Sequence, residues 1–179
     1  MVAIPQQALL VKGLGSWQQS MLAALNADAT GQSGINLRGE VAATQISLSG
    51  NTVRLTLQAA AATSGFTVDS MYFGKPSGTG PDFSGDQVQV FVGGSGSFTV
   101  GVNSSVVTDP FSYTLDETLN AMWAGHLGGA ASSIRILNDS NFLTYFKVSG
   151  TDESALTVAS GYSLISGQAR LLSKIEVFA

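Results

Sequence analysis

A strict two-residue alternation of apolar and polar side chains is the feature that most constrains the fold of this chain. The clearest example spans positions 52–59, where every second residue is apolar: Val53, Leu55, Leu57 and Ala59. Successive side chains of a β-strand point to opposite faces of a sheet, so this pattern predicts a strand with one buried face. A helix of the same residues would place apolar side chains all around its axis.

The same pattern recurs to the end of the chain, with turn residues about every ten positions. Glycine-rich segments such as Gly93–Gly96 separate the alternating stretches, and a longer loop rich in glycine and proline spans 75–85. We therefore predict an all-β domain of roughly nine to ten strands. A jelly-roll-like antiparallel β-sandwich is the expected arrangement, and the absence of an internal repeat disfavours propellers and solenoids.

Residues 104–126 are predicted to form a strand, a turn and a second strand at the centre of this organisation. Phe111, Tyr113 and Leu115 share one face, and Asp116–Glu117 break the pattern. The strand that follows, 119–124, is apolar on both faces, which is typical of a strand inside a two-layer structure. The final alternating stretch, 171–178, is predicted to pair within a sheet.

Residues 1–40 differ from the rest of the chain. After an extended start, Ser16 is predicted to cap a short helix whose apolar residues recur at helical spacing: Trp17, Met21, Leu22 and Leu25. Residues 26–34 are predicted to be a linker, which divides the chain into an arm and helix (1–40) and a sandwich domain (41–179). A lone short helix is marginal in water. It therefore either packs on its own domain or anchors the protein to a larger assembly.

Composition limits the possible partners. Only 11% of the residues are charged while 44% are apolar, so much of the exterior is expected to be covered by other proteins or by copies of the chain. The net charge is −4 with no basic cluster, which argues against nucleic acid as a partner. We expect no secretory signal and no membrane-spanning segment, because the opening residues lack a basic region followed by a long apolar run.

Catalytic signatures are weak. The chain has no cysteine and a single histidine, His126, and no serine lies in a Gly-x-Ser-x-Gly turn. A serine hydrolase needs an oriented serine, histidine and acid, so we expect His126 to be a structural, hydrogen-bonded residue and the protein not to be an enzyme. The scarcity of nitrogen and sulfur ligands argues against zinc. Glycine-rich Gly93–Gly96 is expected to be a hairpin turn, because no helix follows it as in a phosphate-binding loop.

Acidic turns and loop aromatics leave two binding alternatives open. Asp82 and Asp86, and the pairs Asp116–Glu117 and Asp152–Glu153, offer the oxygen ligands that calcium takes from loops. Solvated turns are the simpler interpretation, and we expect no metal or cofactor. Four aromatic residues in or beside loops are candidates for stacking on a sugar ring: Tyr72, Phe83, Tyr145 and Tyr162. Aromatic residues in a sandwich more often belong to the core.

Several phrases in the chain carry a family resemblance when taken in order. They are Thr52-Val-Arg-Leu-Thr-Leu, Phe66-Thr-Val-Asp-Ser-Met-Tyr-Phe-Gly-Lys, Asp82-Phe-Ser-Gly-Asp-Gln-Val-Gln-Val, Val106-Val-Thr-Asp-Pro and Tyr113-Thr-Leu-Asp-Glu-Thr. Residues 45–178 resemble the jelly-roll modules of tailed-bacteriophage virion proteins and the accessory sandwich modules beside some bacterial SGNH/GDSL-type esterases. The likeness is one of strand order and turn phrases. The catalytic Gly-Asp-Ser-Leu element of the esterases does not occur here.

The resemblance implies a non-catalytic module that binds a surface. The expected function is that of a structural virion protein, a capsid decoration or tail component, which attaches through its N-terminal segment and contacts other virion proteins. Self-association is expected, with a trimer favoured, and the loop 75–86 and the turn 149–154 are expected to face outward. The alternative is a carbohydrate-binding or receptor-binding module that uses the four loop aromatics.

Overall fold

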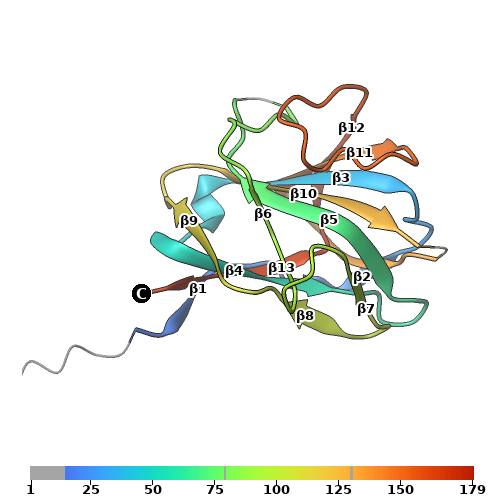
Figure 1. Ribbon diagram of the computed structural model, residues 1–179, viewed down its shortest axis with the longest axis horizontal. Coiled ribbons are helices and arrows are strands. Elements are labelled where there is room, and N and C mark those ends of the chain that lie inside the picture. Colours follow the sequence, from blue (N-terminus) through green and yellow to red (C-terminus); the bar gives the residue numbers. More distant parts are fainter. Residues whose placement is uncertain (1–14, 79, 130) are drawn as a thin grey trace, which may run out of the picture.

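The computed structural model describes residues 15–78, 80–129 and 131–179 and shows two antiparallel sheets packed face to face (Figure 1). The described residues form thirteen strands and one short 3₁₀ helix. In chain order these are β1 (Trp17–Leu22), β2 (Ala27–Ala29), β3 (Ile35–Val41), η1 (Ala43–Gln45), β4 (Gly50–Gln58), β5 (Phe66–Gly74), β6 (Val88–Gln89), β7 (Phe98–Val100), β8 (Ser105–Val107), β9 (Phe111–Leu115), β10 (Ala121–Gly128), β11 (Ile134–Val148), β12 (Ser163–Arg170) and β13 (Leu172–Phe178). The predicted all-β sandwich is confirmed.

The smaller sheet has five strands, in the order β1-β13-β4-β8, with β9 also pairing with β4. The larger has eight, in the order β12-β11-β3-β10-β5-β6, with β2 beside β11 and β7 beside β5. The alternating residues of β4 turn Val53, Leu55 and Leu57 into the space between the sheets, where each is fully buried. β13 lies between β1 and β4, which confirms the predicted pairing of the last strand.

The predicted helix after Ser16 is wrong, because these residues form strand β1. Trp17–Leu22 pairs antiparallel with β13, from Trp17 opposite Phe178 to Leu22 opposite Lys174. A short isolated helix gains little, whereas pairing with β13 satisfies backbone groups along the whole segment. Tertiary pairing therefore decides the local structure here.

The predicted boundary at residue 40 falls inside β3, so it does not separate two structural units. β3 pairs with β10 on one side and β11 on the other, and all seven of its residues are buried. The predicted linker contains β2, which pairs with β11. Residues 15–40 therefore belong to the sandwich, while residues 1–14 of the predicted arm lie outside the described residues.

The predicted hairpin over 104–126 is also corrected. Its two strands exist, but β9 pairs with β4 in the five-stranded sheet, and β10 pairs with β3 and β5 in the eight-stranded sheet. The turn after Leu115 thus carries the chain from one sheet to the other. All eight residues of β10 are buried, as expected of a strand that is apolar on both faces.

The eight-stranded sheet has two buried faces. Its inner face contributes to the main core, where Phe73 packs against Phe111 and Tyr113 with ring centroids 5.7 and 5.1 Å apart. Its outer face carries a second, smaller cluster formed by Phe83, Met122 and Ala124, with Tyr72 packed against them. Two loops, formed by residues 75–78 with 80–87 and by residues 149–162, cover this outer face (upper part of Figure 1).

Candidate functional site

The four predicted anchor residues divide between two environments. Met21 and Leu25 are buried in the main core, with 2% and 7% of their surface exposed, whereas Leu22 is 55% exposed. Trp17 lies half-buried on the outer face of the five-stranded sheet. A strand sends neighbouring side chains to opposite faces, so the single stripe expected of a helix does not form. Trp17 and Leu22 remain available for contact with a partner.

Pairing across β1, β13, β4 and β8 arranges the outer face of the five-stranded sheet in rows. One row runs from Leu22 through Lys174 and Thr56 to Val107. At the end of the sheet nearest residues 1–14, Trp17 and Phe178 form an edge-to-face pair with centroids 5.5 Å apart. Val107 and Phe178 are 45% and 46% exposed, so this face presents apolar side chains to solvent.

Charged residues on the same face neutralise one another. Arg54 Nε donates to Glu176 Oε2 over 3.0 Å, and Lys174 Nζ lies 3.2 Å from Glu176 Oε1. The Arg54 guanidinium also stacks 4.2 Å from the centre of the Trp17 ring. We call the set formed by Trp17, Leu22, Arg54, Val107, Lys174, Glu176 and Phe178 the outer patch. Its compensated charges and exposed apolar side chains resemble the composition of a protein–protein interface.

The four aromatic residues predicted for glycan contact come together on the other side of the molecule, around Arg38. This arginine lies at the centre of β3, with Tyr145 and Ala124 beside it on the neighbouring strands and Tyr72 beyond Ala124. Its guanidinium carbon lies 5.0 Å from the centre of the Phe83 ring and 5.4 Å from that of Tyr162. Phe83 and Tyr145 are only 1% and 8% exposed, so neither offers an open ring face to a sugar.

Arg38 is fully buried and holds both covering loops. Its NH1 donates to the Pro81 carbonyl oxygen over 2.7 Å, and its NH2 donates to the carbonyl oxygens of Glu153 and Leu156 over 3.1 and 2.5 Å. A buried charge needs several hydrogen-bond partners to offset its lost hydration, and here three backbone carbonyls provide them. Lys147 Nζ pairs with the Glu153 carboxylate over 2.6 Å, which anchors the second loop again.

The two covering loops are also bonded directly to each other. Phe83 N donates to the Thr157 carbonyl oxygen over 2.8 Å, and Ala159 N donates to Asp82 Oδ1 over 2.7 Å. Loops that are about seventy residues apart in sequence thereby form one structure, which we call the cap (the described residues of 75–87, without 79, and 149–162). Within the cap, Leu156 and Val158 are 48% and 68% exposed.

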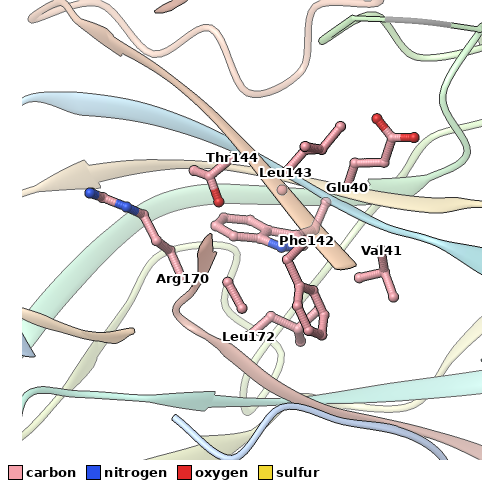
Figure 2. A pocket seen from close by; sticks show the side chains of 10 residues that line it. Glu40, Val41, Phe142, Leu143, Thr144, Arg170 and Leu172 are labelled. Atoms are coloured by element: carbon pink, nitrogen blue, oxygen red, sulfur yellow. The ribbon is translucent and has the colours of Figure 1, made fainter. Parts of the chain in front are cut away.

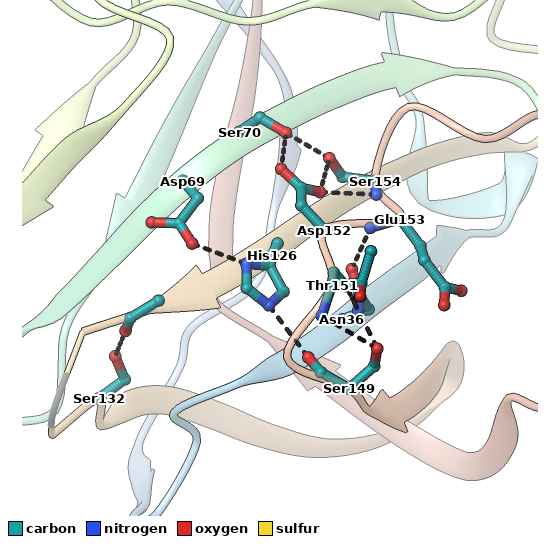
Figure 3. Close-up of polar contacts among 11 residues, drawn as sticks. Asn36, Asp69, Ser70, His126, Ser132, Ser149, Thr151, Asp152, Glu153 and Ser154 are labelled. Carbon is teal, nitrogen blue, oxygen red and sulfur yellow. Dashed lines mark hydrogen bonds and ion pairs between the residues drawn. The ribbon is translucent and has the colours of Figure 1, made fainter.

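A row of polar residues runs beside Arg38 under the cap (Figure 3). Asn36 Nδ2 donates to the Thr151 carbonyl oxygen over 2.8 Å, and its Oδ1 accepts from the Glu153 backbone. Ser70 Oγ donates to Asp152 Oδ2 over 2.6 Å, and Ser154 bonds to the other carboxylate oxygen. Burial alone would raise the pKa of Asp152, but these hydrogen bonds from Ser154 and Ser70 outweigh it and lower that pKa.

His126 occupies a position in this row that is typical of a structural histidine. Its Nδ1 lies 2.8 Å from Asp69 Oδ2, and its Nε2 lies 3.2 Å from the backbone carbonyl oxygen of Ser149 (Figure 3). Asp69, His126 and Ser149 are the residue types of a catalytic triad, but His126 Nε2 contacts the backbone carbonyl oxygen of Ser149 rather than its hydroxyl group. The Ser149 hydroxyl bonds instead to the Thr151 carbonyl oxygen. This arrangement does not activate a serine nucleophile.

The predicted calcium positions hold hydrogen bonds to the protein itself. Asp86 accepts from the Tyr113 hydroxyl over 2.9 Å and from Ser84 over 2.8 Å, and Asp116 accepts from Thr118. Burial alone would raise the pKa of Asp86, but its hydrogen bonds lower it. Within the described residues, no three acidic, histidine or cysteine side chains gather as a metal site would require. Within the same residues, no helix has the length and hydropathy of a membrane span.

Two glutamates with the same exposure, 8%, have opposite environments. Glu176 pairs with Arg54 and Lys174; although burial alone would raise its pKa, these bonds lower it. Glu40, in β3, accepts a hydrogen bond from Asn120 Nδ2 over 2.7 Å, and burial raises its pKa. Among the described residues, no lysine, arginine or histidine forms an ion pair with Glu40. Within the part of the chain that the structure describes, Glu40 is therefore a buried carboxyl group without a cationic partner.

Arg38 and Glu40 are not among the functional residues predicted from the sequence, because both lie where an arm and a domain boundary were predicted. The sequence pattern that could have indicated where they lie is the two-residue alternation of Ile35, Leu37 and Val41 with polar residues. That alternation predicts a strand but not that a cap covers its polar face. Comparison with known proteins adds no family, since no protein-family model and no curated protein matches the chain.

Exchange of each buried glutamate for glutamine should shift stability in opposite directions. Because the pKa of Glu40 is raised, its ionised form opposes folding above that pKa, so Glu40→Gln is expected to stabilise the fold by about 1 kcal/mol near neutral pH. The gain should vanish as the pH falls below the pKa. Glu176→Gln is expected to cost about 1 kcal/mol near neutral pH, and that loss should shrink at low pH.

Urea unfolding of both variants near neutral pH and at about pH 4 measures these effects. The wild-type protein under the same conditions is the reference. Equal losses of stability for the two variants near neutral pH would contradict the assignment of Glu40 as an uncompensated carboxylate.

Proposed function

We propose that this chain is a non-catalytic structural protein of a tailed-bacteriophage particle, a capsid decoration or a tail component. It attaches through its N-terminal segment to other virion proteins and self-associates, with a trimer favoured. The observation that carries the proposal is the outer patch, an uncovered sheet face with exposed Leu22, Val107 and Phe178. The phage setting is supported by the resemblance of residues 45–178 to virion modules.

The position of the outer patch supports attachment through the front of the chain. Trp17 and Phe178 pair at the edge strand β1, and Ser16 N donates to the Ala179 carbonyl oxygen, so residues 1–14 join the fold beside this patch. Nine of those fourteen residues are apolar (Met, Val, Ala, Ile or Leu). The apolar side chains of the patch and the apolar composition of residues 1–14 both favour burial against a partner.

The alternative proposal is a carbohydrate-binding or receptor-binding module. Of its four predicted contact residues, Tyr72 and Tyr162 are partly exposed, whereas Phe83, which belongs to the cap, and Tyr145 are buried. Sugar stacking needs an exposed ring face, so a glycan site of this kind would depend on the two tyrosines alone.

Deletion of residues 1–14 tests attachment without removing β1. We expect the truncated chain to keep its melting temperature within about 2 °C, because every strand pair remains. We also expect it to lose self-association. Light scattering coupled to gel filtration gives the mass of each form, and the variant Leu22→Ser with Phe178→Ser tests the outer patch in the intact chain. The proposal fails if the intact chain is monomeric or if the truncated chain retains the same oligomer.

A further inference from the structure

Glu40 lies in a groove where strand β3 ends and strand β10 begins, in the interior of the eight-stranded sheet. The groove has a volume of about 470 Å³ and is lined by Glu40, Ala42, Asn120, Ser140, Asn141 and Leu143. Figure 2 shows the side chains of Glu40 and Val41 pointing to opposite sides of β3, so Glu40 turns away from the main core. None of the six lining residues is basic.

The shape of the groove follows from an irregularity in β11. Asn138 pairs with Gln168 and Leu143 pairs with Ser166, so four residues of β11 stand opposite one residue of β12. This bulge carries Ser140 and Asn141 out of the regular ladder and places them beside Glu40. Bulges often re-aim side chains near functional sites.

The polar atoms of the groove are mainly acceptors. Asn120 is engaged on both sides, since its Oδ1 accepts from Ala43 N and its Nδ2 donates to Glu40 Oε1. Asn141 donates its Nδ2 to Asp139, which leaves its Oδ1 as an acceptor. The acceptor atoms in question are therefore Asn141 Oδ1, Glu40 Oε2 and the Ser140 hydroxyl oxygen. A ligand with several hydrogen-bond donors would match them.

The charge and the shape of the groove further limit the class of ligand that it can bind. A carboxylate that is nine-tenths buried without a cationic partner is costly, and a ligand cation would remove that cost. The apolar walls of the groove, Ala42 and Leu143, match the methylene stem of a lysine side chain, whose three ammonium hydrogens match the acceptors. We propose that this groove binds the side chain of a lysine from a neighbouring protein. This inference rests on the proposed function, because it names a contact of the same assembled protein.

The proposal is tested with Nα-acetyl-lysine methylamide as the probe, titrated into the isotope-labelled full chain and followed by backbone amide NMR. We expect binding on the order of millimolar, as suits one short contact, with shifts at residues 40–43, 120 and 140–143. Glu40→Gln should weaken binding at least about tenfold, while Asp109→Asn, in the loop contact with Gly93 and Gly94, should leave it unchanged. The titration of the Glu40 carboxyl carbon should move to lower pH when the probe is bound.

Two further probes separate the lysine side chain from other ligands. The Nε-acetylated form of the same probe keeps the stem but loses the charge, and it should not bind. Glucosamine carries an ammonium group without the stem, and it should bind more weakly. The proposal is overturned if the lysine probe causes no shifts at roughly 0.1 M, if Glu40→Gln binds it equally well, or if either control probe binds as tightly.

Repeating the titration with the chain that lacks residues 1–14 distinguishes this inference from the proposed function. Lysine binding should persist in the truncated chain, because none of the lining residues is removed. If the intact chain binds the lysine probe but does not self-associate, the proposed lysine groove is supported and the proposed assembly role is rejected.

Discussion

Arg38→Met is expected to be one of the two most damaging single substitutions in this protein, with a loss of about 3–5 kcal/mol in the free energy of unfolding. Methionine keeps much of the volume of the arginine stem but removes the guanidinium group. The carbonyl oxygens of Pro81, Glu153 and Leu156 then lose their buried donors. Each buried acceptor left without a partner costs about 1–3 kcal/mol.

The same substitution should release the cap more than the sheets. Hydrogen exchange should rise over residues 75–87 and 149–162, while β4 and β13 keep their protection. Arg54→Met is the matched control, because that arginine lies on the solvent side of the other sheet, and it should cost about 1 kcal/mol. Equal losses for the two variants, or unchanged exchange in the cap, would contradict the role of Arg38.

Gly39→Ala is the second substitution with a large expected effect, a loss of about 3 kcal/mol. Gly39 lies opposite Trp123 in the pairing of β3 with β10, and the indole ring rests on the backbone of the glycine. An added Cβ would overlap the ring atoms Nε1, Cε2 and Cζ2 of Trp123. Both residues line a small pocket with only about 10 Å³ of free space (Figure 2), which is far too little to accommodate a displaced indole ring.

Gly150→Ala is the control for this experiment, because an added Cβ there has nothing within 4 Å and the backbone is not left-handed. Chemical unfolding of the two variants should show a loss for Gly39→Ala and a change within about 0.5 kcal/mol for Gly150→Ala. Combining Gly39→Ala with Trp123→Leu should cost less than the sum of the single losses, because the overlap disappears. Additive losses would mean that the indole does not limit the space at Gly39.

The fold class could be predicted from the sequence because period two is a local property. Val53, Leu55 and Leu57 alternate with polar residues, and burial of one face follows directly. Which strands pair with each other, in contrast, depends on residues that are far apart in the sequence. The sequence around Asp116–Glu117 is equally consistent with a hairpin and with a crossing between sheets, and only the packing of β10 between β3 and β5 decides it.

The helix predicted after Ser16 shows a different limit. Trp17, Met21 and Leu25 have helical spacing, yet β13 offers unpaired backbone groups along the same segment. A pattern of three or four apolar residues is too short to outweigh a complete ladder of hydrogen bonds. Met21 and Leu25 are buried but Leu22 is 55% exposed, so the four residues of the pattern share neither a helix nor one environment.

The candidate sites were harder to predict because they combine distant segments. Arg38 binds carbonyl groups of residues 81, 153 and 156, and the groove at Glu40 needs Asn120 and the bulge of β11. Nothing near Glu40 in the sequence indicates that its carboxylate lacks a cationic partner. The four aromatic residues predicted for glycan contact all lie around Arg38, and the pairing of distant strands that brings them there is not visible in the sequence.

The proposed role in a phage particle is tested most directly by protein mass spectrometry of phage particles purified from the source that encodes this chain. We expect the intact chain to band with the particles at a fixed copy number, and a chain that lacks residues 1–14 to be lost from them while remaining folded. Particles without the chain, or with equal amounts of both forms, would contradict an assembly protein held by its front segment.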